Sequence, residues 1–159
     1  MMKRTEVLQN LNTRFKQDIL AVFDKSANRV YVDIQPEAIV PIGRYIFKEL
    51  GARFNTASGI DTRAHLEILY HFTIEAIDLL ISLRVKLNRE KPVIDSLTPV
   101  CEAANWIERE MYELFGIRFK GHPELKRLLL SDKWPKGVYP LRKDYREWDK
   151  NAIRDRGVE

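Results

Sequence analysis

The feature that most constrains the fold is a strict alternation of apolar residues along the stretch 77–88. The apolar positions are Ile77, Leu79, Ile81, Leu83, Val85 and Leu87. Because successive side chains of a β-strand point to opposite faces of the sheet, a period of two over this length predicts a long strand with one buried face. Residues 65–72 alternate in the same way directly before it. The two segments predict a hairpin that turns at residues 73–76.

Two shorter segments have the composition of further strands. Residues 29–34 alternate apolar and polar side chains, and residues 53–60 precede a turn expected at 59–61. With the hairpin they give a small, mostly antiparallel sheet of about four strands. Helical patterns flank these strands, so the fold class predicted is α+β.

Three stretches have apolar residues at helical spacing. Residues 7–20 predict an amphipathic helix of about four turns. Residues 36–50 predict a second helix, bent near Pro41 and ended by the glycine that follows it. The third stretch begins at Thr98, expected as an N-cap, and ends before Gly116, which is placed to stop the helix.

After this third helix the chain changes character. Prolines and glycines interrupt it at Gly121, Pro123, Pro135, Gly137 and Pro140, which prevents long regular elements. We therefore divide the chain into an α+β domain, residues 1–120, and an extended basic C-terminal docking tail, residues 121–159. Leucines and aromatic residues are interleaved with arginines in this tail, which is the composition of interface anchors, although the leucines could equally pack back on the sheet.

Composition excludes several classes of protein. A chain of 159 residues suits one compact domain, and no stretch approaches the roughly 20 apolar residues that span a bilayer. The N-terminus lacks the apolar region of a secretory signal, so we expect the cytoplasm. One cysteine, Cys101, and three dispersed histidines are too few for a metal or iron–sulfur site. We expect no catalytic residue, no cofactor and no metal in this chain.

Charge is unevenly distributed. Residues 1–115 hold 15 Lys or Arg against 16 Asp or Glu, whereas residues 116–159 hold 12 against 7. Basic tails bind nucleic acid or anionic lipid in many proteins, but acidic residues interrupt this one throughout. We expect no nucleic acid as partner. A stand-alone module that binds nucleic acid or anionic lipid stays the alternative of another class, and a steep salt dependence would identify it.

The polar residues of the third helix offer little chemistry. Glu108 and Glu110 are two apart on a helix and point away from each other, so they cannot act as an acid–base pair. We expect an i, i+4 ion pair between Arg109 and Glu113 instead. His122, between glycine and proline, is expected to form hydrogen bonds within its loop rather than to act as a general base.

Three motifs in the second half resemble a known family. The chain reads EREMYELFGIRF from Glu108, then GHPELKRLLL from Gly121 and PLRKDY from Pro140. This pattern resembles the 30 kDa subunit family of respiratory complex I, over roughly residues 29–145. The same family includes the equivalent subunit of membrane-bound group 4 [NiFe] hydrogenases and of related archaeal complexes.

The resemblance implies a non-catalytic structural subunit of a membrane-associated complex I-type oxidoreductase. Such subunits carry no redox centre and brace a large subunit, 49 kDa-like or of the [NiFe] hydrogenase type, in the peripheral arm. A small iron–sulfur subunit would be a second partner, membrane-arm subunits would be indirect ones, and iron–sulfur clusters or nickel–iron would lie in the partners. The expected location is the cytoplasmic side of the cell membrane, held through the partner subunits.

The resemblance also implies an interface on the matched motifs. The residues concerned are Glu108, Arg109, Glu110, Tyr112, Phe115, Gly116, Gly121, His122, Pro123, Arg127, Pro140, Leu141, Arg142, Lys143, Asp144 and Tyr145. Among them, Arg142 can offer a planar fork to a carboxylate of the large subunit. The long linker 134–139 before the last motif favours a membrane-bound hydrogenase or a related ion-pumping archaeal complex. A quinone-reducing NADH dehydrogenase-type complex I stays the alternative.

Overall fold

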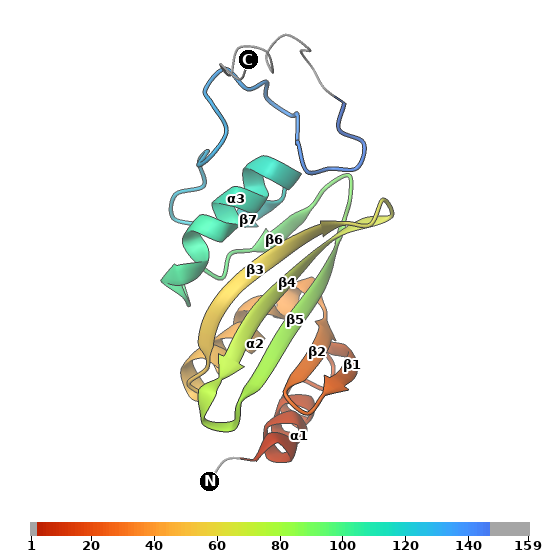
Figure 1. Cartoon of the computed structure of the whole chain (residues 1–159), viewed down its shortest axis with the longest axis vertical. Coiled ribbons are helices and arrows are strands. Elements are labelled where there is room, and N and C mark those ends of the chain that lie inside the picture. The colour runs from red at the N-terminus through yellow and green to blue at the C-terminus, as the bar shows by residue number, and fades with distance from the viewer. Residues whose placement is uncertain (1–2, 147–159) are drawn as a thin grey trace, which may run out of the picture.

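The fold is an α+β layer structure, seen in a computed structural model that describes residues 3–146 (Figure 1). Its strands are β1 (Ile19–Ser26), β2 (Arg29–Ile34), β3 (Arg53–Asp61), β4 (His65–Ile74), β5 (Leu79–Asn88), β6 (Val93–Asp95) and β7 (Arg118–Lys120). Its α-helices are α1 (Arg4–Arg14), α2 (Ile39–Arg44) and α3 (Asn105–Phe115). The α+β class predicted from the sequence is confirmed.

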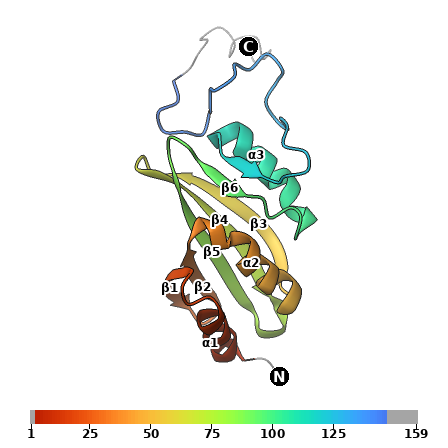
Figure 2. The ribbon, with the colours of Figure 1, turned by 180° about the vertical axis from the view of Figure 1, so that it is seen from behind.

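The core lies between one face of the main sheet and the helices. The five-stranded sheet has the order β1-β2-β5-β4-β3, and its long hairpin of β4 and β5 pairs Leu66 with Leu87 and Ile74 with Leu79. These alternating apolar side chains are buried, as the period of two predicts. Helices α1 and α2 cover this face (Figure 2), whereas no helix lies over the opposite face in the described residues.

The prediction for the N-terminal region was wrong in part. The first helix ends at Arg14, and Ile19 and Leu20 begin strand β1 instead of continuing it. Ile19 is four residues after Phe15, so helical spacing alone could not exclude it from the helix. Pairing with β2 decides the outcome, and it gives the sheet five strands instead of about four. Because β2 and β5 are parallel, the sheet is mixed.

The second helix is assembled from three pieces. A 3₁₀ turn at Pro36–Ala38 leads into α2, and a π-helical turn at Tyr45–Glu49 follows it. Gly51 has a φ of 65°, so it ends the helix as expected. The β3–β4 turn lies at residues 62–64, slightly later than predicted, because β3 continues to Asp61.

The third helix also begins later than expected. A 3₁₀ turn at Glu102–Ala104 precedes α3, and the Thr98 hydroxyl donates to Glu108 instead of capping a helix. Gly116 ends α3 with a φ of 74°, which confirms its predicted role. Beyond it, β7 pairs in parallel with β6, a small second sheet that the sequence patterns did not predict.

Candidate protein interface

Glu108 is the most buried charged residue of the matched motif. Its side chain is fully buried, yet it carries a carboxylate that accepts four donors. The Ser96 hydroxyl donates at 2.5 Å, the Leu97 N–H at 2.8 Å and the Thr98 hydroxyl at 3.0 Å. The Tyr70 hydroxyl of β4 approaches at 3.4 Å. Glu108 therefore ties the connection before α3 to the helix and to the main sheet.

Burial controls the ionisation of this cluster. Removal from water raises the pKa of Glu108, although the donors Ser96, Leu97 and Thr98 favour the carboxylate and oppose the rise. Burial also raises the pKa of Tyr70 well above its usual value, and the nearby Glu108 adds to that effect. Thr98 of this cluster lines a pocket beside the start of the helix, but the Glu108 carboxylate itself is fully buried, so we assign the cluster a role in supporting the fold.

Arg109 and Glu113 do not form the ion pair predicted from their spacing. Arg109 donates to the carbonyl oxygens of Lys126 and Arg127, at 3.2 and 2.8 Å. Glu113 accepts the N–H groups of three successive residues, Leu128, Leu129 and Leu130, at 3.0, 2.5 and 3.2 Å. The two side chains bind consecutive backbone groups of one stretch, residues 126–130, and thereby fix the start of the tail along α3.

Further along the described part of the tail, residues 141 and 142 are held at the end of α3, whereas residues 147–159 lie outside the described residues. The Leu141 N–H donates to the carbonyl of Leu114 at 3.1 Å, and the Arg142 Nε donates to the carbonyl of Phe115 at 2.7 Å. These contacts place the segment beside the C-terminus of α3, where carbonyl groups lack partners within the helix.

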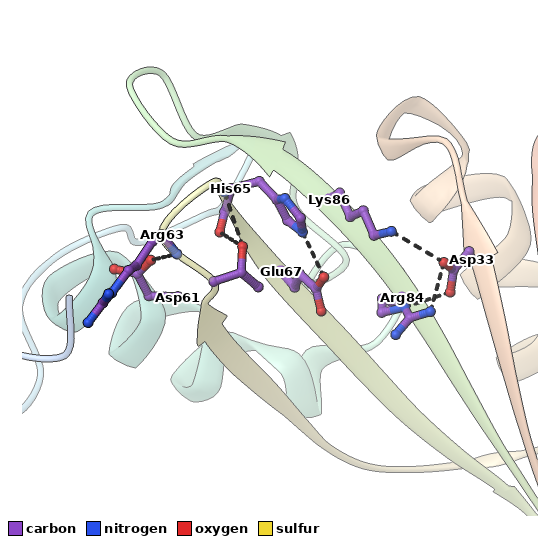
Figure 3. Close-up of polar contacts among 8 residues, drawn as sticks. Asp33, Asp61, Arg63, His65, Glu67, Arg84 and Lys86 are labelled. Atoms are coloured by element: carbon purple, nitrogen blue, oxygen red, sulfur yellow. Dashed lines mark hydrogen bonds and ion pairs between the residues drawn. The ribbon is translucent and has the colours of Figure 1, made fainter. Parts of the chain in front are cut away.

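Asp61 and Arg89 were missed by the sequence analysis, yet both hold the tail. The Asp61 carboxylate, at the end of β3, accepts the Arg63 N–H at 2.7 Å (Figure 3). It also accepts the Lys143 N–H at 2.8 Å. Arg89 pairs with Asp61 and reaches Asp144 at 3.0 Å. Burial alone would raise the pKa of Asp61, but these N–H groups and the guanidinium lower it overall. No local signal links Asp61 to a residue 82 positions further along the chain.

Aromatic rings pack along the tail and against the end of α3. The Tyr139 ring lies directly against Gly116, where a β-carbon would collide with it. The Arg142 guanidinium lies over the same ring, 4.7 Å from its centroid. Trp134 stacks on Tyr145 with ring centroids 6.1 Å apart. The sequence alone indicated interface anchors here, and the structure shows them packed within the chain.

Arg127 and His122 hold two segments of the tail with hydrogen bonds. Arg127 donates to the carbonyls of Ser131 and Trp134, both at 2.7 Å. His122 accepts the Glu124 N–H at Nδ1, 3.0 Å away, so its Nε2 carries the proton and donates to the Asn105 carbonyl at 3.1 Å. The loop role predicted for His122 is confirmed.

Other residues of the predicted interface stay partly accessible. Glu110 and Tyr112 are partly exposed on α3, as is Pro140 in the tail, whereas Phe115 is buried against Gly59 of β3. Gly121 and Pro123 line a shallow pocket of about 630 Å³ that also includes Cys101. The largest exposed apolar side chains near these motifs are Trp106, Leu129 and Leu141, at 70%, 62% and 51% exposure.

The open face of the sheet carries charges that are already paired. Arg84 donates two hydrogen bonds to the Asp33 carboxylate, at 2.6 and 2.8 Å, and the Lys86 amino group lies 3.8 Å from the same carboxylate (Figure 3). The His65 ring bonds Glu67 at 2.7 Å. These charged groups of the open face therefore satisfy one another's hydrogen bonds within the sheet.

Two absences bear on cofactors and membranes. Between residues 3 and 146, no three or more His, Cys, Asp or Glu side chains group closely enough to hold a metal ion. No helix in that range is long and apolar enough to cross a membrane.

The sequence matches the family described as respiratory-chain NADH dehydrogenase, 30 kDa subunit, over residues 32–151. The chain belongs to this family. It is 34% identical over 154 residues to a subunit of the F(420)H(2) dehydrogenase of Methanosarcina mazei, and the match covers 94% of this chain and 96% of that protein. It is 33% identical over 150 residues to a subunit of the NADH-quinone oxidoreductase of Ruegeria pomeroyi, covering 89% and 74%.

Solved structures share the fold of this family member. A chain of the membrane-bound sulfane sulfur reductase, an archaeal respiratory membrane complex, superposes with a TM-score of 0.79 at 17% identity, covering 97% of this chain and 90% of that one. A trypsin-resistant fragment of Nqo5 gives a TM-score of 0.65 at 24% identity, covering 78% and 100%. The resemblance drawn from the motifs at Glu108, Gly121 and Pro140 is confirmed.

Proposed function

We propose that this chain is a non-catalytic subunit of a complex I-type oxidoreductase and that its tail docks on the large subunit of that complex. The proposal rests on the hydrogen bonds that hold the tail against α3 and β3. Arg109 and Glu113 of the family motif bind the backbone of residues 126–130. Residues 141–143 are held by the backbone at the end of α3 and by Asp61. A segment held in this way keeps its outward side chains in place without a regular element, which lowers the entropy cost of binding.

The outward side chains of the tail have the chemistry of a protein interface. Leu129 and Leu141 are exposed, and basic Lys143 and Arg146 lie exposed near them in sequence. Arg142 uses its Nε within the chain, and its two terminal amino groups form no hydrogen bond with the described residues. The proposed partner surface is therefore apolar with a carboxylate opposite Arg142.

The redox chemistry of the complex would belong to other chains. We place the iron–sulfur clusters, and nickel–iron if the complex is a hydrogenase, in the large subunit and the small iron–sulfur subunit. The chain would lie peripherally on the cytoplasmic side of the membrane, held by these partners. The long linker 134–139 favours a membrane-bound hydrogenase or a related ion-pumping archaeal complex over a quinone-reducing one, and the 34% identity to the F(420)H(2) dehydrogenase subunit agrees with an archaeal complex. Nickel in the purified complex would decide for the hydrogenase.

Leu129→Asp combined with Leu141→Asp tests the docking. Both side chains point outward, so the isolated chain should keep its circular dichroism and unfolding midpoint. Recovery of the chain with a tagged large subunit should fall at least about tenfold, because charges would be buried in the interface. Val93→Asp is the matched control, since Val93 is 41% exposed and lies outside the tail. Unchanged recovery of the double variant would disprove the docking role.

A further inference from the structure

Strand β1 forms an edge of the main sheet beside which no further strand lies in the described residues, and its Asp24 side chain is bonded by Arg4 of α1 at 2.5 Å. The sheet order places β1 at one end and β3 at the other. Helix α3 packs beside β3, with Phe115 against Gly59, whereas β1 pairs with β2 alone in the described residues. An edge strand presents unpaired N–H and C=O groups along its outer side, and such a row pairs readily with another strand.

The same strand exposes an unusual amount of apolar surface. Leu20, Val22 and Phe23 are 57%, 44% and 48% exposed, three large apolar side chains within four residues. Residues 19–23 contain no charge, glycine or proline. A segment of this kind at an open edge is an aggregation hazard unless something covers it.

The register shows that both faces of this edge are apolar. Val22 pairs with Val32, whose side chain is in the core, and Phe23 pairs with Tyr31 on the open face. Directly opposite residues share a face of the sheet. The Arg84 guanidinium lies 5.3 Å from the Phe23 ring centroid, which confirms that Phe23 is on the open side. An added strand could therefore bury apolar side chains above and below the sheet.

Two irregularities limit the length of the pairing. The register of β1 shifts between Ile19 and Ala21 and again between Asp24 and Ser26. Bulges and charges are the devices that keep edge strands from extensive pairing, and Asp24 and Lys25 add such charges here. The regular edge is residues 21–24, which fits a short strand only.

We propose that the edge of β1 at residues 21–24 pairs with a short apolar β-strand from another subunit of the complex. This rests on the proposed function, because a four-residue pairing is too weak to hold two proteins together and needs an assembly already joined elsewhere. In Figures 1 and 2, β1 lies far from the tail, so both surfaces can be occupied at once.

Val22→Lys in the complete complex is the first test. The lysine places a charge on the edge, so the amount of this chain recovered per large subunit should fall about tenfold. Ile60→Lys is the matched control, because Ile60 is a 42% exposed strand residue at the opposite side of the sheet. Phe23→Lys, also within residues 21–24, serves as a second variant if Val22→Lys does not fold when isolated. Unchanged recovery of a folded variant would overturn the proposal.

Hydrogen exchange of the unmodified chain is an independent test. Amides of residues 21–24 that exchange rapidly in the isolated chain should become at least about tenfold slower in the purified complex. Equal exchange in both would overturn the proposal. A dimer of the isolated chain that Val22→Lys dissociates would assign the edge to a second copy and overturn it as well. Loss of recovery in the Leu129 and Leu141 variant, with normal recovery of Val22→Lys, would disprove this inference while supporting the tail docking.

Discussion

Two glutamates of helix α3 perform the same chemistry with different consequences. Glu108 and Glu113 lie five residues apart, and each carboxylate accepts backbone N–H groups from a segment without regular structure. Glu108 holds the connection before the helix and is fully buried in the domain. Glu113 holds the tail that follows the domain. One family motif therefore stabilises the core with one carboxylate and positions the candidate interface with the other.

Of the substitutions that test this difference, Glu108→Ala should lower the stability of the chain most. It leaves the Leu97 N–H and three hydroxyls without their acceptor inside the protein, which should lower the free energy of unfolding by about 2–4 kcal/mol. Urea denaturation of the isolated chain measures it. Glu108→Gln keeps one acceptor oxygen, so its free energy of unfolding should fall by clearly less. A loss below about 1 kcal/mol in the alanine variant would show that water replaces the carboxylate.

Glu113→Ala should release the tail while leaving the domain folded. The free energy of unfolding should fall by about 1–2 kcal/mol, because three N–H groups lose their acceptor but lie near solvent. Trypsin should then cleave after Arg127 and Lys133 several-fold faster than in the unaltered chain. Glu110→Ala is the control, since Glu110 is on the same helix and makes no contact with the tail among the described hydrogen bonds. Equal cleavage in both variants would refute the anchoring role.

The pH dependence of stability should separate Glu108 from the Gln variant. The folded state raises the pKa of Glu108 above 4.5, so the folded chain binds that proton more tightly than the unfolded chain. The stabilisation that comes from this raised pKa is fully present below the unfolded pKa, and it is lost as pH rises through the higher folded pKa. The unaltered chain should lose stability relative to Glu108→Gln over that range. If the urea midpoints of the two proteins changed in parallel from about pH 4 to 8, this expected difference would be contradicted.

Asp61→Asn should have the smallest effect, confined to the end of the tail. The folded state lowers the Asp61 pKa below 3.8, so its contacts are present above that pH and are lost as pH falls through the folded value. The variant should lower the free energy of unfolding by less than about 1 kcal/mol. It should also speed hydrogen exchange at the Lys143 amide. Asp144→Asn, whose side chain is 66% exposed, should change little. An unaffected Lys143 amide would show that Asp61 does not hold the tail.

Much of the domain could be predicted because its patterns are local. The alternation at 77–88 marks β5, and Gly116 marks the end of α3, since each depends on neighbouring residues alone. Strand β1 could not be separated from a helix, because Ile19 fits both spacings until β2 is beside it. The Arg109–Glu113 pair failed for a related reason: the backbone of residues 126–130 offers both side chains more partners than they offer each other.

The sequence by itself determined the fold class, the family and the shortage of metal ligands, because these depend on residue types, periodicity and spacing. Only the tertiary structure decided which charged residues of the motif face inward. It also revealed Asp61 and Arg89 as anchors of the tail, through contacts with Lys143 and Asp144. Backbone N–H and carbonyl groups are the same at every residue, so a side chain that binds them leaves no pattern in the sequence of the segment it holds.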